Sequence, residues 1–590
     1  MTIADETKCA PAVPDLPLAD RARSRGDLAA AVGIGLLCFV LYIIPSAWRP
    51  LSETSEARVA VVAREMLRCG DWIVPKLGHE PRFQKPPMPY WLTALSAKLL
   101  GPDAAGHLVT EQAAVLPSAI LAALTVFLVM VYGSRVHGRT VGIWAGLILG
   151  LGYPLFVRTA QFGTGEIPLT FFTLGALLAA AWLACAPRPG LLCALALGLT
   201  LGLAILCKGH IPLLLVLAGL AVEALRRRAF NLRKVVVCAA ALALAAAVVL
   251  PWILAIYKRA PEGLGTLWAE AGVGSEGMGH LPTYPFTFYF EKLAEGLLPW
   301  TPLLLLVWPL AVKRKKLEQG IRTAPPSLPD LLERFLWGTA LVGFVGFYLW
   351  PKQQNYYLLP LLPPLAVCAG VALARLSRPG GNYEELLAWI HMVLAVPLAV
   401  LLALVPVIAP AFVKNPDTPI PPLEFTAALG ILTAVLVFVA GRMWVEGKPL
   451  IAGLCLGAVA YTATFGWTVV KYYHSAERHP LAQEAVTLRE QLKRLPQQAR
   501  VYAVGLGLSE AELLYYLDRP AMGGSAVLLA ETTDAQGQPL APKPSDPPRF
   551  VLCSKACAEE LGLLDAAKVE LVQLGKGIQG VDFKRCLKKR

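Results

Sequence analysis

Long apolar stretches recur along most of this 590-residue chain and alternate with short polar segments. Each stretch has about the 20 residues that a helix needs to cross a bilayer. The pattern predicts an α-helical polytopic membrane protein with about 13 transmembrane helices. The stretches lie near residues 28–47, 113–132, 140–157, 166–185, 191–207, 211–225, 235–257, 296–312, 335–350, 356–376, 386–412, 425–441 and 450–471.

Composition excludes a soluble protein. Hydrophobic residues make up 56% of the chain and charged residues only 16%, against about 25% charged residues in ordinary soluble domains. The mean hydropathy is +0.55. The net charge of +13 would suggest a nucleic-acid partner in a soluble protein, but most of the excess lies in short loops between apolar stretches. Topology and attraction to anionic membrane lipids explain it, so we expect membrane lipids and no nucleic acid as partners.

The basic loops predict the orientation of the chain. Clusters of Arg and Lys precede the first apolar stretch and follow the sixth and the eighth. With thirteen spans, all three clusters face the cytoplasm, as the positive-inside rule requires. The segment 1–27 is polar and shows no cleavable signal sequence, so we expect a cytoplasmic N-terminal segment followed by a self-anchoring span. Three large segments then lie on the opposite face: 48–112, 258–295 and 472–590.

These segments complete the predicted domain organisation. Residues 28–471 form the membrane domain, which includes the periplasmic loop 48–112. That loop contains two helical patterns, at 56–67 and 90–100, with a Pro-rich turn between them. In the tail, the runs 501–504 and 550–552 are typical of strands, and 510–517 is typical of a helix. We therefore expect a small soluble periplasmic α/β domain at 472–590.

Two residues of the first outer loop could carry chemistry. Glu56 begins a helical pattern, where a carboxylate either stabilises the helix dipole or serves a function. Lys85 lies between an aromatic-rich strand and the rigid turn Pro86-Pro87. A stiff backbone suits a Lys that is fixed against a phosphate, although a Lys beside aromatic residues is also common at membrane interfaces.

Further candidates lie at the ends of the apolar stretches. Glu166 begins the fourth span, where a carboxylate is either functional or a partner of the helix dipole. Lys208 ends the fifth span, and Tyr356 and Tyr357 begin the tenth. His280 lies in the outer loop 258–295. The thirteen-span topology places all of them on one face, which suggests a site for an anionic, lipid-linked substrate.

Several short motifs carry a family resemblance. In chain order they are Glu56-Ala-Arg58, Gly70-Asp-Trp, Gln84-Lys-Pro-Pro, Ile167-Pro-Leu-Thr-Phe-Phe and Tyr357-Leu-Leu-Pro-Leu-Leu-Pro-Pro. Together they resemble the family 39 glycosyltransferases, which include bacterial relatives of the protein O-mannosyltransferases and the aminoarabinose transferase that modifies lipid A. These enzymes have the GT-C membrane fold.

The resemblance implies a function. The family transfers a sugar from a polyprenyl-phosphate carrier to an acceptor on the periplasmic side of the bacterial inner membrane. The acceptor would be a lipid A-like glycolipid, a protein or another glycan. The leaving phosphate needs cations more than a strong acid, which makes Lys85 its main candidate ligand. The other substrate-binding candidates are Arg58, Lys208, His280, Tyr356 and Tyr357, and the catalytic candidates are Ser55, Glu56 and Glu166.

Three departures from the family pattern affect this interpretation. Ser55 stands where the family carries its key Asp, and Ser can neither act as a base at neutral pH nor hold a divalent metal as a carboxylate does. Gln84 replaces the acid before Lys85, which weakens any metal hypothesis. Glu166 replaces the family's second Asp. We therefore assign no metal ligands and no certain cofactor, and a divalent metal stays an open alternative.

Two rival functions also stay open. A lipid or sugar transporter would show the same spans, but it would place ionisable groups near the bilayer midplane rather than at one surface. A catalytically inactive homologue that only binds the carrier is the other alternative, and Ser55 is the argument for it.

Overall fold

The structure is a computed structural model. It describes residues 18–47, 51, 54–78, 80–103, 107–152, 156–227, 231–270, 284–285, 287–297, 300–301, 304–305, 327–349, 354–376, 404, 423–446, 455, 458, 500–504, 514–515, 521–523, 549–554, 572–574 and 578–582.

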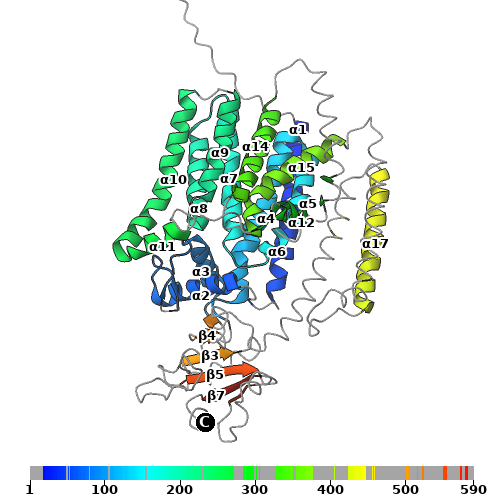
Figure 1. Ribbon diagram of the computed structural model, residues 1–590. Helices are drawn as coiled ribbons and strands as arrows, with labels where there is room; N and C mark the ends of the chain where they lie inside the picture. The colour runs from blue at the N-terminus through cyan, green and yellow to red at the C-terminus, as the bar shows by residue number, and fades with distance from the viewer. Residues whose placement is uncertain are drawn as a thin grey trace, which may run out of the picture.

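Long apolar helices form most of the described structure, and they run side by side in one bundle (Figure 1). Among the described residues, seven segments are long and apolar enough to cross a membrane, which confirms a helical, multi-pass membrane protein. The segments are Arg25–Ala47, Glu111–His137, Glu166–Cys185, Leu191–Lys208, Leu232–Arg259, Leu328–Leu349 and Tyr356–Arg375. They correspond to α1 (Leu18–Ile43) with η1 (Ile44–Ala47), α4 (Glu111–His137), α7 (Glu166–Cys185), α8 (Leu191–Lys208), α10 (Leu232–Arg259), α14 (Leu328–Leu349), and η2 (Asn355–Leu361) with α15 (Leu362–Leu376).

The remaining predicted spans have mixed outcomes. Two of them are the helices α9 (Ile211–Arg227) and α17 (Leu423–Val445). The stretch 140–157 is not one helix, because α5 (Arg139–Gly150) ends after 12 residues and α6 begins only at Phe156. Gly152 and Pro154 interrupt the apolar run, and both residue types disfavour a helix interior. The stretches 296–312, 386–412 and 450–471 fall mainly outside the described residues, so the count of thirteen stays a prediction.

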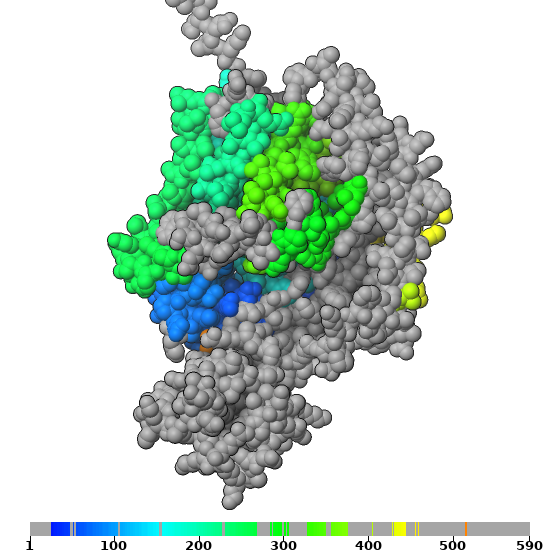
Figure 2. All heavy atoms as spheres, in the orientation of Figure 1, coloured from blue at the N-terminus to red at the C-terminus, as the bar shows by residue number. Residues whose placement is uncertain are grey.

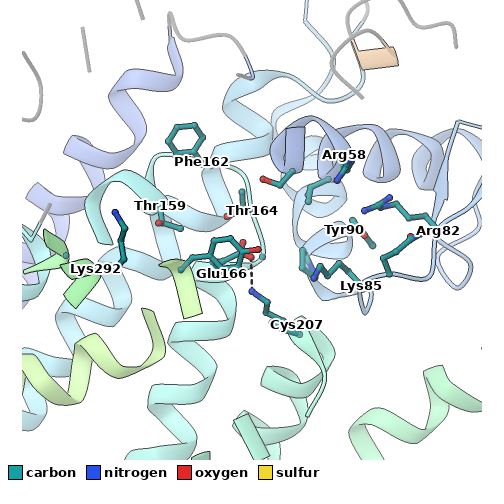
Figure 3. A pocket seen from close by; sticks show the side chains of 18 of the residues that line it. Arg58, Arg82, Lys85, Tyr90, Thr159, Phe162, Thr164, Glu166, Cys207 and Lys292 are labelled. Carbon is teal, nitrogen blue, oxygen red and sulfur yellow. Dashed lines mark hydrogen bonds and ion pairs between the residues drawn. The ribbon is translucent and has the colours of Figure 1, made fainter. Parts of the chain in front are cut away.

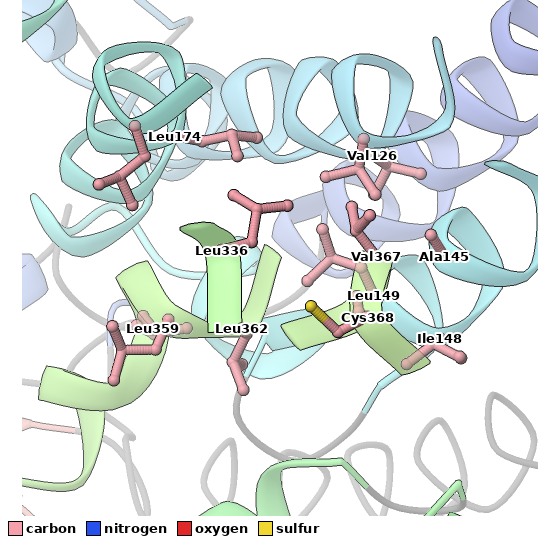
Figure 4. Packing of buried hydrophobic residues seen from close by; sticks show 14 of the residues in the cluster. Val126, Ala145, Ile148, Leu149, Leu174, Leu336, Leu359, Leu362, Val367 and Cys368 are labelled. Carbon is pink, nitrogen blue, oxygen red and sulfur yellow. The ribbon is translucent and has the colours of Figure 1, made fainter. Parts of the chain in front are cut away.

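The bundle is held together by close-packed apolar side chains. Figure 4 shows residues of α4, α5, α7, α14 and α15 meeting in one cluster, among them Val126, Leu174 and Leu336. The helices α4 and α5 approach very closely, because a Cβ added at Gly142 would lie 2.4 Å from the carbonyl oxygen of Met130. Small residues that let backbones approach in this way are typical of membrane helix interfaces.

The first outer segment folds at one end of the bundle. Its helices α2 (Thr54–Cys69) and α3 (Met88–Leu100) confirm the two predicted helical patterns. Between them, β1 (Lys76–Leu77) and β2 (Glu80–Pro81) form a short antiparallel hairpin. Figures 1 and 2 show this segment, in blue, beneath the ends of the green helices that include α8 and α10. Two further short helices are α11 (Glu262–Glu270) and α12 (Phe288–Gly296).

Strands of the tail form a mixed sheet with the order β4-β3-β5-β7-β6. The runs predicted as strands are β3 (Arg500–Val504) and β5 (Arg549–Ser554), which pair in parallel. The others are β4 (Ala521–Gly523), β6 (Val572–Leu574) and β7 (Ile578–Asp582).

One short piece of the tail docks on the first outer segment. Leu514 and Tyr515 are helical and buried, and they pack in an apolar cluster with residues of α2, α3 and α4. The buried guanidinium of Arg64, in α2, donates to the carbonyl oxygens of Leu514 and Tyr515 at 3.3 and 3.2 Å. The Tyr515 hydroxyl donates to the carbonyl oxygen of Val109 at 3.0 Å. The tail and the outer loop are therefore joined by specific polar contacts.

Candidate functional site

A cavity of about 620 Å³ lies where the first outer segment meets the ends of the membrane helices. Its walls come from α2, the β2–α3 loop, the α6–α7 loop, the end of α8, α12 and the start of η2 (Figure 3). Both polar and apolar atoms face it. The Arg, Lys and Glu residues of its lining are Arg58, Arg82, Lys85, Glu166, Lys208, Lys292 and Glu295.

Lys85 stands on a loop that is anchored on both sides. Before it, Phe83 is buried in an apolar cluster with Met88 and Trp252. After it, Pro86 and Pro87 lead directly into α3, and the fixed φ of Pro stiffens this approach. The predicted rigid setting of Lys85 is therefore present, because core packing and the two Pro residues limit the movement of its backbone.

Arg58 and Arg82 share this wall with Lys85. Figure 3 shows Arg58, Arg82 and Lys85 on the same side of the cavity, around Tyr90. Burial raises the pKa of the Tyr90 hydroxyl above its usual value, while the nearby guanidinium groups of Arg82 and Arg58 offset part of this rise. The hydroxyl is therefore protonated at neutral pH. This wall presents three cations and a phenol, a set of donors that suits a phosphate.

Glu166 stands between the two walls of the cavity as the first residue of α7. Lys208, the last residue of α8, donates to its Oε1 at 3.1 Å. The Lys208 ammonium also lies 4.2 Å from the ring centre of Tyr356 and 4.8 Å from that of Tyr357. The ion pair and the two cation–π contacts therefore hold this ammonium beside the carboxylate, from α7 on one side and from η2 on the other.

The opposite wall is formed by α12 and the end of α6. Lys292 and Glu295 face the cavity from α12, and their charged groups are 2.5 Å apart. Thr159 and Phe162 complete this wall (Figure 3). It combines a cation, a carboxylate and a hydroxyl, so its character is mixed rather than strongly cationic.

The structure brings most of the predicted site residues together. Ser55, Arg58, Lys85, Glu166, Lys208 and Tyr356 all line the cavity. Tyr357 is not among the lining residues, and its ring contacts the Lys208 ammonium. His280 lies outside the described residues.

Glu56 differs from this group. Its side chain is fully buried and does not line the cavity. Its Oε1 accepts a hydrogen bond from the backbone N–H of Gly163 at 2.8 Å. The adjacent Ser55 is exposed and faces the cavity instead.

Three Arg, Lys and Glu residues of the lining were not among the candidates from the sequence: Arg82, Lys292 and Glu295. Arg82 lies three residues before Lys85, so proximity to the Lys85 motif was a usable signal. Lys292 and Glu295 belong to a segment that offered no comparable signal, because their place depends on how α12 packs against η2.

The lining residues fit a divalent metal poorly. Within the described part of the chain, no three or more His, Cys, Asp or Glu side chains are grouped closely enough to hold one. The two carboxylates of the cavity each pair with a Lys, and Ser55 and Gln84 are weak ligands for a hard cation. The arrangement is suited instead to binding an anion beside one carboxylate.

Sequence comparison agrees with the motifs. Residues 84–254 match the family model described as dolichyl-phosphate-mannose-protein mannosyltransferase. A protein of Proteus mirabilis named undecaprenyl phosphate-alpha-4-amino-4-deoxy-L-arabinose arabinosyl transferase 2 is 24% identical over 447 residues, which cover 74% of this chain and 76% of that protein. A protein of Sodalis glossinidius with the same name is 31% identical over 363 residues, which cover 58% of this chain and 61% of that protein.

Comparison with solved structures addresses the fold. The crystal structure of ArnT from Cupriavidus metallidurans bound to undecaprenyl phosphate has a TM-score of 0.67 at 19% identity, and the match covers 94% of this chain and 98% of that one. The apo structure of the same protein has a TM-score of 0.68 at 20% identity. Motifs, relatives and fold thus agree that this chain is similar to the family 39 glycosyltransferases of the GT-C type, and among them to the aminoarabinose transferases.

Proposed function

We propose that the cavity transfers a sugar from a polyprenyl-phosphate carrier to an acceptor on the periplasmic face of the inner membrane. The observation that carries this proposal is that Arg58, Arg82 and Lys85 lie on one wall of the same cavity that Glu166 lines. The donor phosphate would bind the cationic wall, where fixed positive charges stabilise the negative charge that develops as it leaves.

The chemical step follows from the order of groups across the cavity. An acceptor oxygen attacks the anomeric carbon from the face opposite the phosphate, and the new C–O bond forms as the bond to the phosphate oxygen breaks. The electron pair of the broken bond leaves with the polyprenyl phosphate. When the acceptor is a hydroxyl, the Glu166 carboxylate takes its proton. The anomeric configuration inverts in this single displacement.

The surroundings of Glu166 hold its carboxylate in one place in the cavity. Lys208 holds the carboxylate at 3.1 Å, and Tyr356 and Tyr357 hold Lys208 in turn. Lys292, on the mixed wall, lies on the far side of Glu166 from the phosphate wall (Figure 3). We assign the acceptor to this side, because in-line attack requires it to approach away from the leaving phosphate.

The rival functions receive less support. A transporter would place its ionisable groups at the middle of the bundle, whereas these lie at one end, beside the first outer segment. The argument for an inactive homologue is that Ser55 cannot act as a base. Glu166 supplies a carboxylate in the same cavity, so the site does not need one at position 55.

Mass spectrometry of lipid and glycan extracts tests the proposal. Cells that carry the gene should contain a glycosylated product that deletion removes and the wild-type gene restores. The Lys85→Ala variant should fail to restore it. The matched control is Lys98→Ala, because Lys98 is exposed on α3 and does not line the cavity. Full restoration by Lys85→Ala would contradict the phosphate assignment, and identical extracts with and without the gene would contradict the function.

A further inference from the structure

Glu56 occupies an unusual place for a carboxylate next to a reaction cavity. It lies in the first turn of α2, between Ser55 and Arg58, which both line the cavity. Its own side chain is fully buried and points its Oε1 at the N–H of Gly163, 2.8 Å away. A general base must come within about 3 Å of the proton that it removes. Glu56 is therefore placed to hold a backbone segment rather than to react.

The segment that it holds is the α6–α7 loop. Gly163 is pressed against α4, because an added Cβ would lie 2.5 Å from the carbonyl oxygen of Ala114. The hydroxyl of Ser118, also in α4, donates to the carbonyl oxygen of Thr164 at 3.3 Å. Three residues after Gly163 the loop ends at Glu166, which begins α7. The loop is thus fixed from one side by α4 and from the other by Glu56.

We propose that Glu56 is a positioning residue that sets the place of the Glu166 carboxylate relative to the phosphate wall. Its hydrogen bond ties α2, which carries Arg58, directly to the loop that carries Glu166. A displacement of about 1 Å between reacting groups can cost about 100-fold in rate. This inference rests on the proposed function, in which Glu166 receives the acceptor proton.

The role requires a hydrogen-bond acceptor and not a proton acceptor. The amide oxygen of Gln can accept from the Gly163 N–H with the same geometry, whereas Leu cannot. Glu56→Gln should therefore keep kcat within about 3-fold of wild type, while Glu56→Leu should lose about 100-fold in kcat with little change in the KM for the donor. If Glu56 were instead the general base, Glu56→Gln would abolish turnover as fully as Glu56→Leu, because neither side chain can take a proton.

Gly163 offers an independent variant of the same contact. A methyl group in Gly163→Ala would meet the backbone of Ala114, so the loop must shift. We expect a loss in kcat similar to that of Glu56→Leu. The double variant should lose little more than either single variant, since both changes disturb one loop. Gly163→Ala also tests the inference if Glu56→Leu does not fold.

The decisive readout does not depend on turnover. Hydrogen exchange with mass detection on the purified protein should show faster exchange of the amides at 161–166 in Glu56→Leu and wild-type exchange in Glu56→Gln. Slow exchange in Glu56→Leu, or a loss in Glu56→Gln equal to that in Glu166→Gln, would overturn the positioning role. If the wild type transfers no polyprenyl-phosphate-linked sugar, the proposed function fails instead, and the exchange result still decides whether Glu56 holds the loop.

Discussion

The ion pair between Lys208 and Glu166 allows a quantitative test of the site. The Lys208 Nζ lies 3.1 Å from the Glu166 Oε1. At an effective dielectric constant of about 20, two unit charges at that distance attract by about 5 kcal/mol, and the cost of desolvating them partly offsets this attraction. Both side chains are mostly shielded, with exposed fractions of 8% for Lys208 and 17% for Glu166. Removing one partner of such a pair costs about 3–5 kcal/mol, because it leaves the other charge buried alone.

Lys208→Met should therefore destabilise the protein strongly. Methionine has a similar length, and its thioether can pack against the rings of Tyr356 and Tyr357, so the cost comes from the unpaired Glu166 rather than from a void. The double variant Lys208→Met with Glu166→Gln removes both charges. It should recover most of the lost stability, because an isolated buried charge no longer exists. Turnover should stay very low in both variants, since the carboxylate is either misplaced or missing.

Thermal unfolding in detergent, followed by intrinsic tryptophan fluorescence, measures the stability of wild type, both single variants and the double variant. Turnover of the same preparations is measured with a polyprenyl-phosphate sugar donor. The reasoning is refuted if the two substitutions lower the unfolding midpoint additively, because the two side chains would then not interact. A double variant with wild-type turnover would refute the catalytic role of Glu166.

Three other substitutions test separate parts of the structure. Ser55→Asp places a carboxylate on the cavity wall and should preserve or raise turnover, so a complete loss would show that the site differs from the family pattern. Lys292→Ala should raise the KM for the acceptor by about 10-fold or more, because the acceptor loses a hydrogen bond to a charged group. A rise in the KM for the donor instead would reverse the assignment of the two walls. Arg64→Ala should speed tryptic cleavage of the tail after residue 500, because the carbonyl groups of Leu514 and Tyr515 lose their donor. The control Arg68→Ala, at an exposed position on α2, should leave the cleavage rate unchanged. Equal cleavage rates in the two variants would exclude this docking contact.

The sequence predicts the membrane part of the site well for a physical reason. Glu166, Lys208 and Tyr356 stand at the ends of apolar stretches, and a bilayer forces such ends into two planes. Once the orientation of the spans is known, these residues must lie on one face. Lys85 was predictable because two Pro residues restrict its backbone, whatever the rest of the fold does.

Other features depend on contacts between distant segments. Nothing local distinguishes the buried Glu56 from the exposed Ser55 beside it, since the difference arises from the approach of Gly163, about a hundred residues later. Lys292 and Glu295 reach the cavity only through the packing of α12. The break between α5 and α6 has a local cause instead, in Gly152 and Pro154, but hydropathy alone does not show where a helix ends.

The docking of the tail on α2 has a practical consequence for anyone who shortens this protein. Arg64 is 5% exposed, and two of its acceptors are carbonyl groups supplied from beyond residue 500. A truncation after the last apolar stretch would leave that guanidinium with Glu65 but without these two acceptors, on the same helix that carries Arg58. Low yield or low turnover of such a fragment would then report a damaged α2 and would say nothing about a catalytic contribution from the part removed. The appropriate control is a truncated protein in which Arg64 is also replaced by an apolar residue.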